Sequence, residues 1–113
     1  MQAAVHHRAM EKAIAKGDLA PMYYPLLYGA DPNRRNDQKE LLLELAIREK
    51  QTLNVAYLFC FKASREELTS TGETLSQLAR RVRNECTGDE DLEMRSQAIL
   101  ELVEQPGTER LIR

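Results

Sequence analysis

The stretch Gly29-Ala30-Asp31-Pro32-Asn33 separates an apolar run from a polar one. Leu26 and Leu27 precede it, and Leu41-Leu42-Leu43 follows after a polar segment. Glycine readily adopts the left-handed conformation that closes a helix, and the residue before a proline is biased towards extended geometry. The stretch therefore predicts the end of one helix, an extended excursion over residues 29–39, and the start of another helix.

The same pattern returns 33 positions later, where Lys62-Ala63-Ser64 again follows an apolar run. Shifting the sequence by 33 residues places small residues on small ones and large residues on large ones. The matched positions are Ala13 with Ala46 and Ala79, Tyr24 with Tyr57, Ala30 with Ala63, Leu42 with Leu75, and Leu45 with Leu78. Because one helix–turn–helix unit cannot bury both faces of its helices, such units have to stack.

The composition favours an all-α fold. The chain has 113 residues, no tryptophan and 5% aromatic residues, and helix-favouring Leu, Ala, Glu, Arg and Gln dominate. Apolar periodicity predicts helices over residues 2–16, 19–28, 41–49, 53–61 and 75–83, and a last helix that begins after Gly88 and ends at Pro106-Gly107. We expect a single domain over residues 1–105 and a C-terminal tail over residues 106–113.

Some side chains have expected local roles. Asp18 and Thr52 are expected to cap the helices that follow them. The run from Leu53 to Phe61 is apolar nearly all round, so it should pack on more than one side and bury Cys60.

The tyrosines divide into two pairs. Tyr24 and Tyr57 are related by the repeat and are expected in the core. Tyr23 and Tyr28 fit either the core or an interface equally well.

The repeat resembles that of the ankyrin family. Gly29-Ala30-Asp31-Pro32-Asn33 is similar to the family's Gly-Ala-Asp-x-Asn, and the segment from Gly72 to Ala79 is similar to its Gly-x-Thr-Pro-Leu-His-x-Ala opening. The resemblance covers roughly residues 9–83, about three degenerate units, and implies stacked helix–turn–helix units with extended finger loops. The openings lack the family's Pro and His, and extra residues near 87–91 displace the last helix. Another α-helical hairpin repeat, of roughly 34 residues, is the alternative.

Charge and hydropathy exclude several classes of function. The formal net charge is −2, so the chain lacks the basic footprint of a protein that binds nucleic acid or an anionic membrane. No apolar run approaches the roughly 20 residues of a membrane helix, and the first residues do not form a signal peptide. Two cysteines without a secretory signal indicate a reducing compartment, and we expect a cytoplasmic protein.

The chemistry-bearing residues do not form a recognisable site. His6 and His7 are adjacent, so on a helix they point about 100 degrees apart and cannot share a metal on one face. Cys60 and Cys86 lack metal-ligand spacing, and Cys86 is expected to be an ordinary exposed thiol. Phosphate-binding loops and nucleophile elbows are missing from the sequence. We expect no cofactor, no metal, no catalytic residues and no enzymatic activity.

The ankyrin resemblance implies a concave binding surface built from finger tips and inner helices. The family's variable contact positions fall here on Arg34, Arg35, Asp37, Gln38, Glu40, Glu44, Arg48, Glu49, Ser70, Thr71, Glu73, Gln77 and Arg81. This set mixes both signs of charge, which suits a protein partner. The expected function is a non-enzymatic protein–protein interaction module, acting as an adaptor or an inhibitor.

Two alternatives stay open at this point. The chain could be a structural subunit of a homo-oligomer, assembled through the apolar helix over residues 53–61 or through the end helix with His6 and His7. It could also be a small immunity, antitoxin or effector-type inhibitor. The sequence does not identify the partner protein.

Overall fold

The computed structural model describes residues 2–107, with side chains from Arg8 onward. Six helices lie in this range: α1 (Gln2–Lys16), α2 (Ala20–Leu27), α3 (Leu42–Arg48), α4 (Thr52–Cys60), α5 (Leu75–Glu85) and α6 (Glu90–Glu104). Within the same range there are two isolated β-bridges and no strand, so the expected all-α fold is confirmed. Residues 108–113 of the expected tail, and the side chains of His6 and His7, lie outside the described part.

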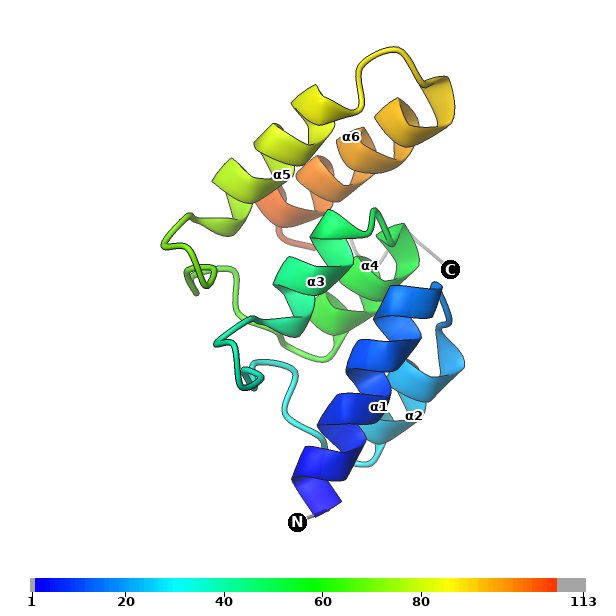
Figure 1. Cartoon of the computed structure of the whole chain (residues 1–113), viewed down its shortest axis with the longest axis vertical. Coiled ribbons are helices and arrows are strands. Elements are labelled where there is room, and N and C mark those ends of the chain that lie inside the picture. Colours follow the sequence, from blue (N-terminus) through cyan, green and yellow to red (C-terminus); the bar gives the residue numbers. More distant parts are fainter. Residues whose placement is uncertain (1, 108–113) are drawn as a thin grey trace.

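The helices form two layers. Each odd-numbered helix packs on the even-numbered helix that follows it. In one layer α3 lies between α1 and α5, and in the other α4 packs against α6 (Figure 1). The helix pairs follow one another along the long axis of a molecule that measures 43 × 31 × 25 Å.

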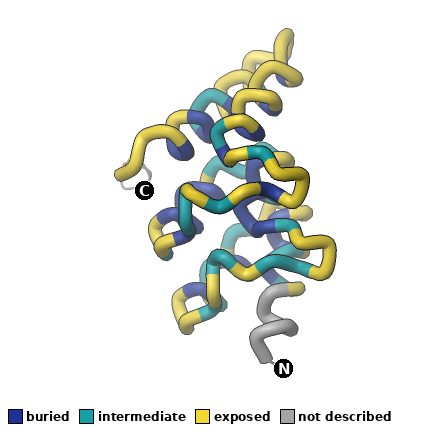
Figure 2. The backbone as a smooth tube through the Cα atoms, turned by 90° about the vertical axis from the view of Figure 1, so that its left-hand side faces the viewer, coloured by how far each residue is buried: buried dark blue, intermediate teal, exposed yellow. Residues whose placement is uncertain are grey.

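The core lies between the two layers. Buried residues follow the helices on their facing sides, while most residues of the loops on one side of the molecule are exposed or half-buried (Figure 2). Ala13, Ala46 and Ala79 occupy matched positions on α1, α3 and α5 and are 2%, 0% and 0% exposed. Small side chains at these positions allow neighbouring helices of one layer to approach closely.

Helices α1 to α4 end with the same hydrogen bonds. In α1 the amide of Gly17 donates to Ile14 and that of Asp18 to Ala13, and in α3 Lys50 donates to Ile47 and Gln51 to Ala46. This pair of bonds is a Schellman motif, which requires a left-handed residue. Gly17 and Gly29 supply it after α1 and α2, and Lys50 and Lys62 supply it after α3 and α4.

The two predicted helix caps are wrong. Asp18 uses its amide to close α1, so Leu19 becomes the N-cap of α2 and no side-chain capping bond forms. Thr52 is already the first residue of α4, after the N-cap Gln51, which also makes no side-chain capping bond. Helix α2 therefore begins one residue later than the sequence pattern suggested, and α4 begins one residue earlier.

Three burial predictions are also wrong, two of them because the residues fall on the sides of α2 and α4 that face solvent. Cys60 is exposed rather than buried, and Tyr24 is 56% exposed rather than part of the core. Cys86 is buried instead of exposed, at the end of α5 where that helix packs on α6. The expectation that α4 packs on more than one side is confirmed by its contacts with α3 and α6.

Candidate protein-binding face

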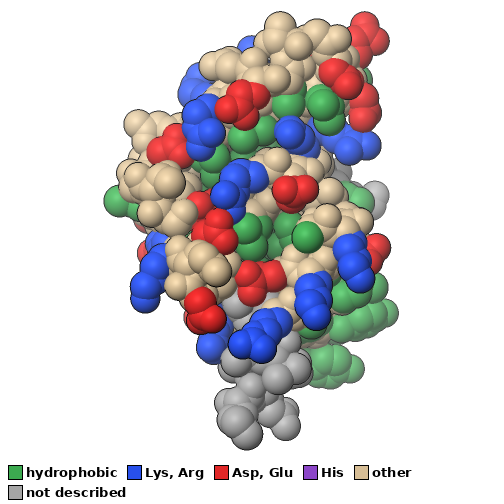
Figure 3. All heavy atoms as spheres, in the orientation of Figure 1, with side chains coloured by type: hydrophobic (Ala, Val, Ile, Leu, Met, Phe, Trp, Pro, Cys, Tyr) green, Lys and Arg blue, Asp and Glu red, His purple; other side chains and the backbone are tan. Residues whose placement is uncertain are grey.

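The inner face comprises α1, α3 and α5 with two loops, which we name the first finger (residues 28–41) and the second finger (residues 61–74). Figure 3 looks onto the inner helices, with the fingers at the left edge, and shows acidic and basic side chains interspersed over this surface. All of the contact residues predicted from the sequence belong to the two fingers, to α3 and its C-terminal end, or to α5.

Both fingers are closed by the same hydrogen bonds at their tips. In the first, the amide of Asn36 donates to the carbonyl of Glu40 at 3.0 Å, and in the second Thr69 donates to Glu73 at 2.8 Å. The bridges Arg35–Leu41 and Leu68–Thr74 flank these bonds. Each of these contacts lies 33 residues after its counterpart.

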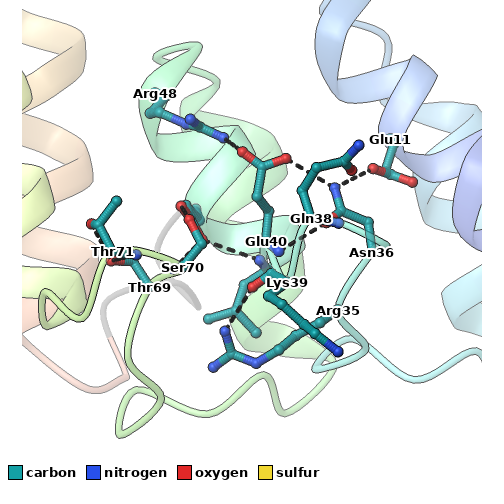
Figure 4. Close-up of polar contacts among 12 residues, drawn as sticks. Glu11, Arg35, Asn36, Gln38, Lys39, Glu40, Arg48, Thr69, Ser70 and Thr71 are labelled. Carbon is teal, nitrogen blue, oxygen red and sulfur yellow. Dashed lines mark hydrogen bonds and ion pairs between the residues drawn. The ribbon is translucent and has the colours of Figure 1, made fainter.

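One side-chain oxygen organises each tip. Asn36 Oδ1 accepts the amides of Gln38 and Glu40 at 3.0 and 2.8 Å (Figure 4). The side-chain oxygen of Thr69, Oγ1, accepts the two corresponding amides of the second finger, at 3.4 and 3.1 Å. Sequence reasoning missed Asn36 and Thr69, although their spacing of 33 and their side-chain acceptors were visible in the sequence.

Each finger carries an ion pair to the inner helix beside it. Glu40 pairs with Arg48, and Glu73 pairs with Arg81, whose guanidinium donates at 2.8 and 3.1 Å. The pKa of Glu40 is lowered below its usual value, mainly by a hydrogen bond from Asn36 and to a smaller extent by one from Arg48. The hydrogen bonds from Arg81 are the main reason that the pKa of Glu73 is lowered. Both carboxylates are therefore charged at neutral pH.

Carboxylates on α1 and α3 hold the fingers in place. Glu11 on α1 accepts a hydrogen bond of 2.7 Å from the amide group of Asn36. Glu44, at the matched position of α3, accepts the backbone amide of Ser70 at 2.9 Å and the Ser70 hydroxyl. Glu44 also accepts the amide of Leu41 at 3.3 Å.

Glu44 differs from the rest of the predicted contact set because its side chain is inside the protein. The residue is 3% exposed and both carboxylate oxygens are engaged. It presents no surface to a partner but fixes the tip of the second finger. Glu44 is therefore a residue that positions the second finger and not a contact residue.

The fingers are also tied to each other. Arg35 of the first finger donates to the carbonyl of Leu68 at 2.7 Å and pairs with Glu67 at 3.2 Å. The side chain of Asn33 accepts the amide of Ser64 at 2.7 Å. Arg35 thus acts in the first instance as a link between the two fingers, with 30% of its side chain accessible.

The remaining predicted residues reach solvent to different degrees. Glu40 and Glu73 are half-buried because of their ion pairs. The exposed residues are Arg34, Asp37, Gln38, Arg48, Glu49, Ser70, Thr71, Gln77 and Arg81. Gln77 is partly committed, since its side chain accepts the amide of Thr74 at 2.8 Å at the start of α5. Arg34 and Asp37 make no ion pair within the described residues.

A hollow of about 240 Å³ lies between α1 and the first finger. Its walls carry both signs of charge, from Arg8, Glu11, Arg34, Arg35 and Asp37, together with Asn36 and Gln38. Such a lining can accept a polar or charged side chain of another protein.

Metal binding and membrane insertion leave recognisable structural features, which can be looked for in the described residues. Among the side chains that the structure describes, from Arg8 to Gly107, no three His, Cys, Asp or Glu residues gather as a metal ion would require. No helix in this range combines the length and apolar character needed to cross a membrane. No protein-family model matches the sequence, and comparison with curated proteins and with solved structures gives no match.

Proposed function

We propose that this chain is an ankyrin-like repeat protein that binds another protein through its inner face and has no enzymatic activity. The 33-residue recurrence of finger bonds, helix ends and ion pairs supports the ankyrin-like assignment. An adaptor and an inhibitor would use the same surface, and the proposal covers both.

The main support for the proposal comes from the repeated ion pairs. Glu40–Arg48 and Glu73–Arg81 hold exposed charges in fixed positions at equivalent places on consecutive units. A surface that is ordered before binding loses less conformational entropy on association. Fixed charges of both signs also favour one partner over others by electrostatic complementarity.

Exchanging the charges within each pair tests the proposal. Arg48→Glu alone would place two carboxylates together, so Glu40→Arg is combined with Arg48→Glu, and Glu73→Arg with Arg81→Glu. These swaps keep a pair at each place but invert the charges offered to a partner. The matched control swaps Asp91 and Arg95 on α6, a pair at 3.2 Å away from the inner face.

The wild type and the three swap variants are used to capture partners from the native cell, with bound proteins quantified by mass spectrometry. Thermal unfolding followed by circular dichroism checks that each swap is folded. We expect the two inner-face swaps to lose partners that the wild type and the α6 swap retain, with at least about a tenfold loss of affinity. Equal retention by all variants would contradict the proposal.

A further inference from the structure

The outer helices of the first two units lack charged residues. Neither α2 nor α4 contains an Asp, Glu, Lys or Arg. In α6, by contrast, Glu90, Asp91, Glu93, Arg95 and Glu101 are all exposed. Solvent-facing sides of helices are normally polar or charged, so the absence on α2 and α4 requires an explanation.

We name the solvent-facing stripes of α2 and α4 the outer face. It comprises Ala20, Tyr24 and Leu27 of α2 with Leu53, Tyr57 and Cys60 of α4, of which Tyr57 is partly buried against the core. Tyr24, Leu27 and Leu53 are 56%, 51% and 48% exposed. The spacing within each helix places the three residues on one stripe. Each residue of the α4 stripe follows its α2 counterpart by 33 positions.

Aromatic contacts join the two stripes into one surface. The ring of Tyr23 lies edge-on to those of Tyr24, Tyr57 and Phe61, with centroid distances of 5.6, 5.4 and 5.6 Å. Figure 3 shows the edge of this surface as hydrophobic side chains at the lower right, where α2 lies in Figure 1. A contiguous exposed apolar patch of this kind marks an interaction site.

Charges at the rim of the outer face differ between the two units. At the ends of α2 lie Asp18 and Asp31, and at the ends of α4 lie Lys50 and Lys62. None of the four makes an ion pair within the described residues. Lys16 and Glu49 are also near, but they lie at the ends of α1 and α3 in the inner layer. The rim is thus acidic around the first unit and basic around the second.

We propose that the outer face binds the outer face of a second copy of this chain, about a twofold axis parallel to α2 and α4. A twofold interface uses one patch on both subunits, so the patch must be complementary to itself. This axis places α2 on the partner's α4. It brings Asp18 opposite the partner's Lys50 and Asp31 opposite the partner's Lys62.

The rim charges select this axis over the perpendicular one. An axis across the helices would place Asp18 opposite the partner's Asp31 and Lys50 opposite the partner's Lys62, and like charges repel. The uncharged centre offers an unrelated protein no charge by which to recognise it. The inner face stays free in this dimer, so the inference does not depend on the proposed function.

Sedimentation equilibrium of the full chain over a range of concentrations tests the dimer. Tyr24→Lys and Leu53→Glu place charges in the outer face, and each is expected to raise the dimer dissociation constant by at least about tenfold. Met94→Lys is the matched control, because Met94 is 73% exposed on α6, outside the outer face. A monomeric wild type at every soluble concentration, or dimerisation unaffected by both substitutions, would overturn the proposal.

A charge exchange tests the axis. Asp18→Lys and Lys50→Asp each create like charges across the dimer, and each should weaken it several-fold, whereas the double variant should recover affinity near that of the wild type. Asp also tolerates the left-handed conformation of residue 50, where φ is 54°. A double variant that dimerises no better than the single variants would exclude the proposed axis.

Discussion

The two fingers have the same hydrogen-bonded shape but different side chains at its key positions. The oxygen that closes the tip belongs to Asn36 in the first and to Thr69 in the second. The left-handed residue is Lys39 in the first, with φ at 65°, and Gly72 in the second, with φ at 85°. The shape therefore depends on an acceptor and a left-handed residue at fixed places, and more than one residue type satisfies each requirement.

The turns that follow the helices also share one shape but differ in residue type between the units. Glycine occupies the left-handed position after α1 and α2, whereas lysine occupies it after α3 and α4. A lysine in this conformation is strained by its Cβ. The same turn therefore costs more conformational energy after α3 and α4 than after α1 and α2.

The largest expected effect concerns the carboxylates that hold the fingers. Glu44→Ala should destabilise the protein by about 2–3 kcal/mol, because it leaves the buried amide of Leu41 and the donors of Ser70 without their acceptor. Glu11→Ala removes one bond to Asn36 in a more exposed place and should have a smaller effect. Urea unfolding measures both.

Glu49→Ala serves as the control for the loss of a carboxylate from α3, since Glu49 lies exposed at the end of that helix. An equal loss of stability in Glu44→Ala and Glu49→Ala would show that Glu44 does not hold the second finger.

Exchanging residues at the matched positions after α2 and α4 should have opposite effects. Gly29→Ala introduces a Cβ at φ 101° and should destabilise the protein by about 1–2 kcal/mol. Lys62→Gly relieves the backbone strain at φ 74°. Glycine has a larger conformational entropy in the unfolded chain, which offsets part of this gain, so the protein should be stabilised by about 0.5–1 kcal/mol. Thermal unfolding compares the two, and effects of the same sign would argue against equivalent turns.

The first turns of α3 and α5 differ in one bond. Thr74 Oγ1 accepts the amide of Gln77 at 3.0 Å, whereas Leu41 at the matched position has no oxygen to offer. Thr74→Ala should therefore destabilise the protein by about 1 kcal/mol. Thr74→Ser keeps the acceptor and should retain most of the stability in the same unfolding experiment. A Ser variant as unstable as the Ala variant would assign the effect to packing instead of capping.

Acid should weaken the finger ion pairs, and this is the smallest expected effect. In the folded protein the pKa of Glu40 lies below its ordinary value of 4.5. The stability that this carboxylate contributes is therefore fully present above pH 4.5, and it is lost as the pH falls through the lower pKa of the folded state. Arg48→Met should reduce this loss, with a change below about 1 kcal/mol because solvent reaches the exposed Arg48 and screens the pair. Urea unfolding at neutral and acidic pH measures the difference, and identical pH profiles would contradict the pairing.

The sequence predicted helix positions well because apolar spacing and turn residues determine them. The helix expected over residues 2–16 is confirmed, and the one expected over residues 75–83 extends to Glu85. The prediction for Asp18 failed because its amide closes α1, and the prediction for Thr52 failed because α4 begins at Thr52 itself, after the N-cap Gln51. These helix boundaries depend on backbone geometry that residue types alone do not specify.

Burial was predicted less well because it depends on what lies opposite a residue. Cys60 and Tyr24 occur in apolar helices, but their sides of those helices face solvent. Glu44 has a surface-type side chain but is buried under the second finger. Its partner Ser70 is 26 residues away, a contact that the periodicity of α3 could not reveal.

Hydrogen exchange of the chain bound to a captured partner tests the central claim most directly. The proposed function predicts slower exchange of backbone amides in both fingers, around residues 34–40 and 70–73, and along the exposed sides of α3 and α5. The inner-face swaps should abolish this protection, and the α6 swap should leave it intact. Protection confined to α2, α4 and α6, with unchanged exchange in both fingers, would contradict binding through the inner face.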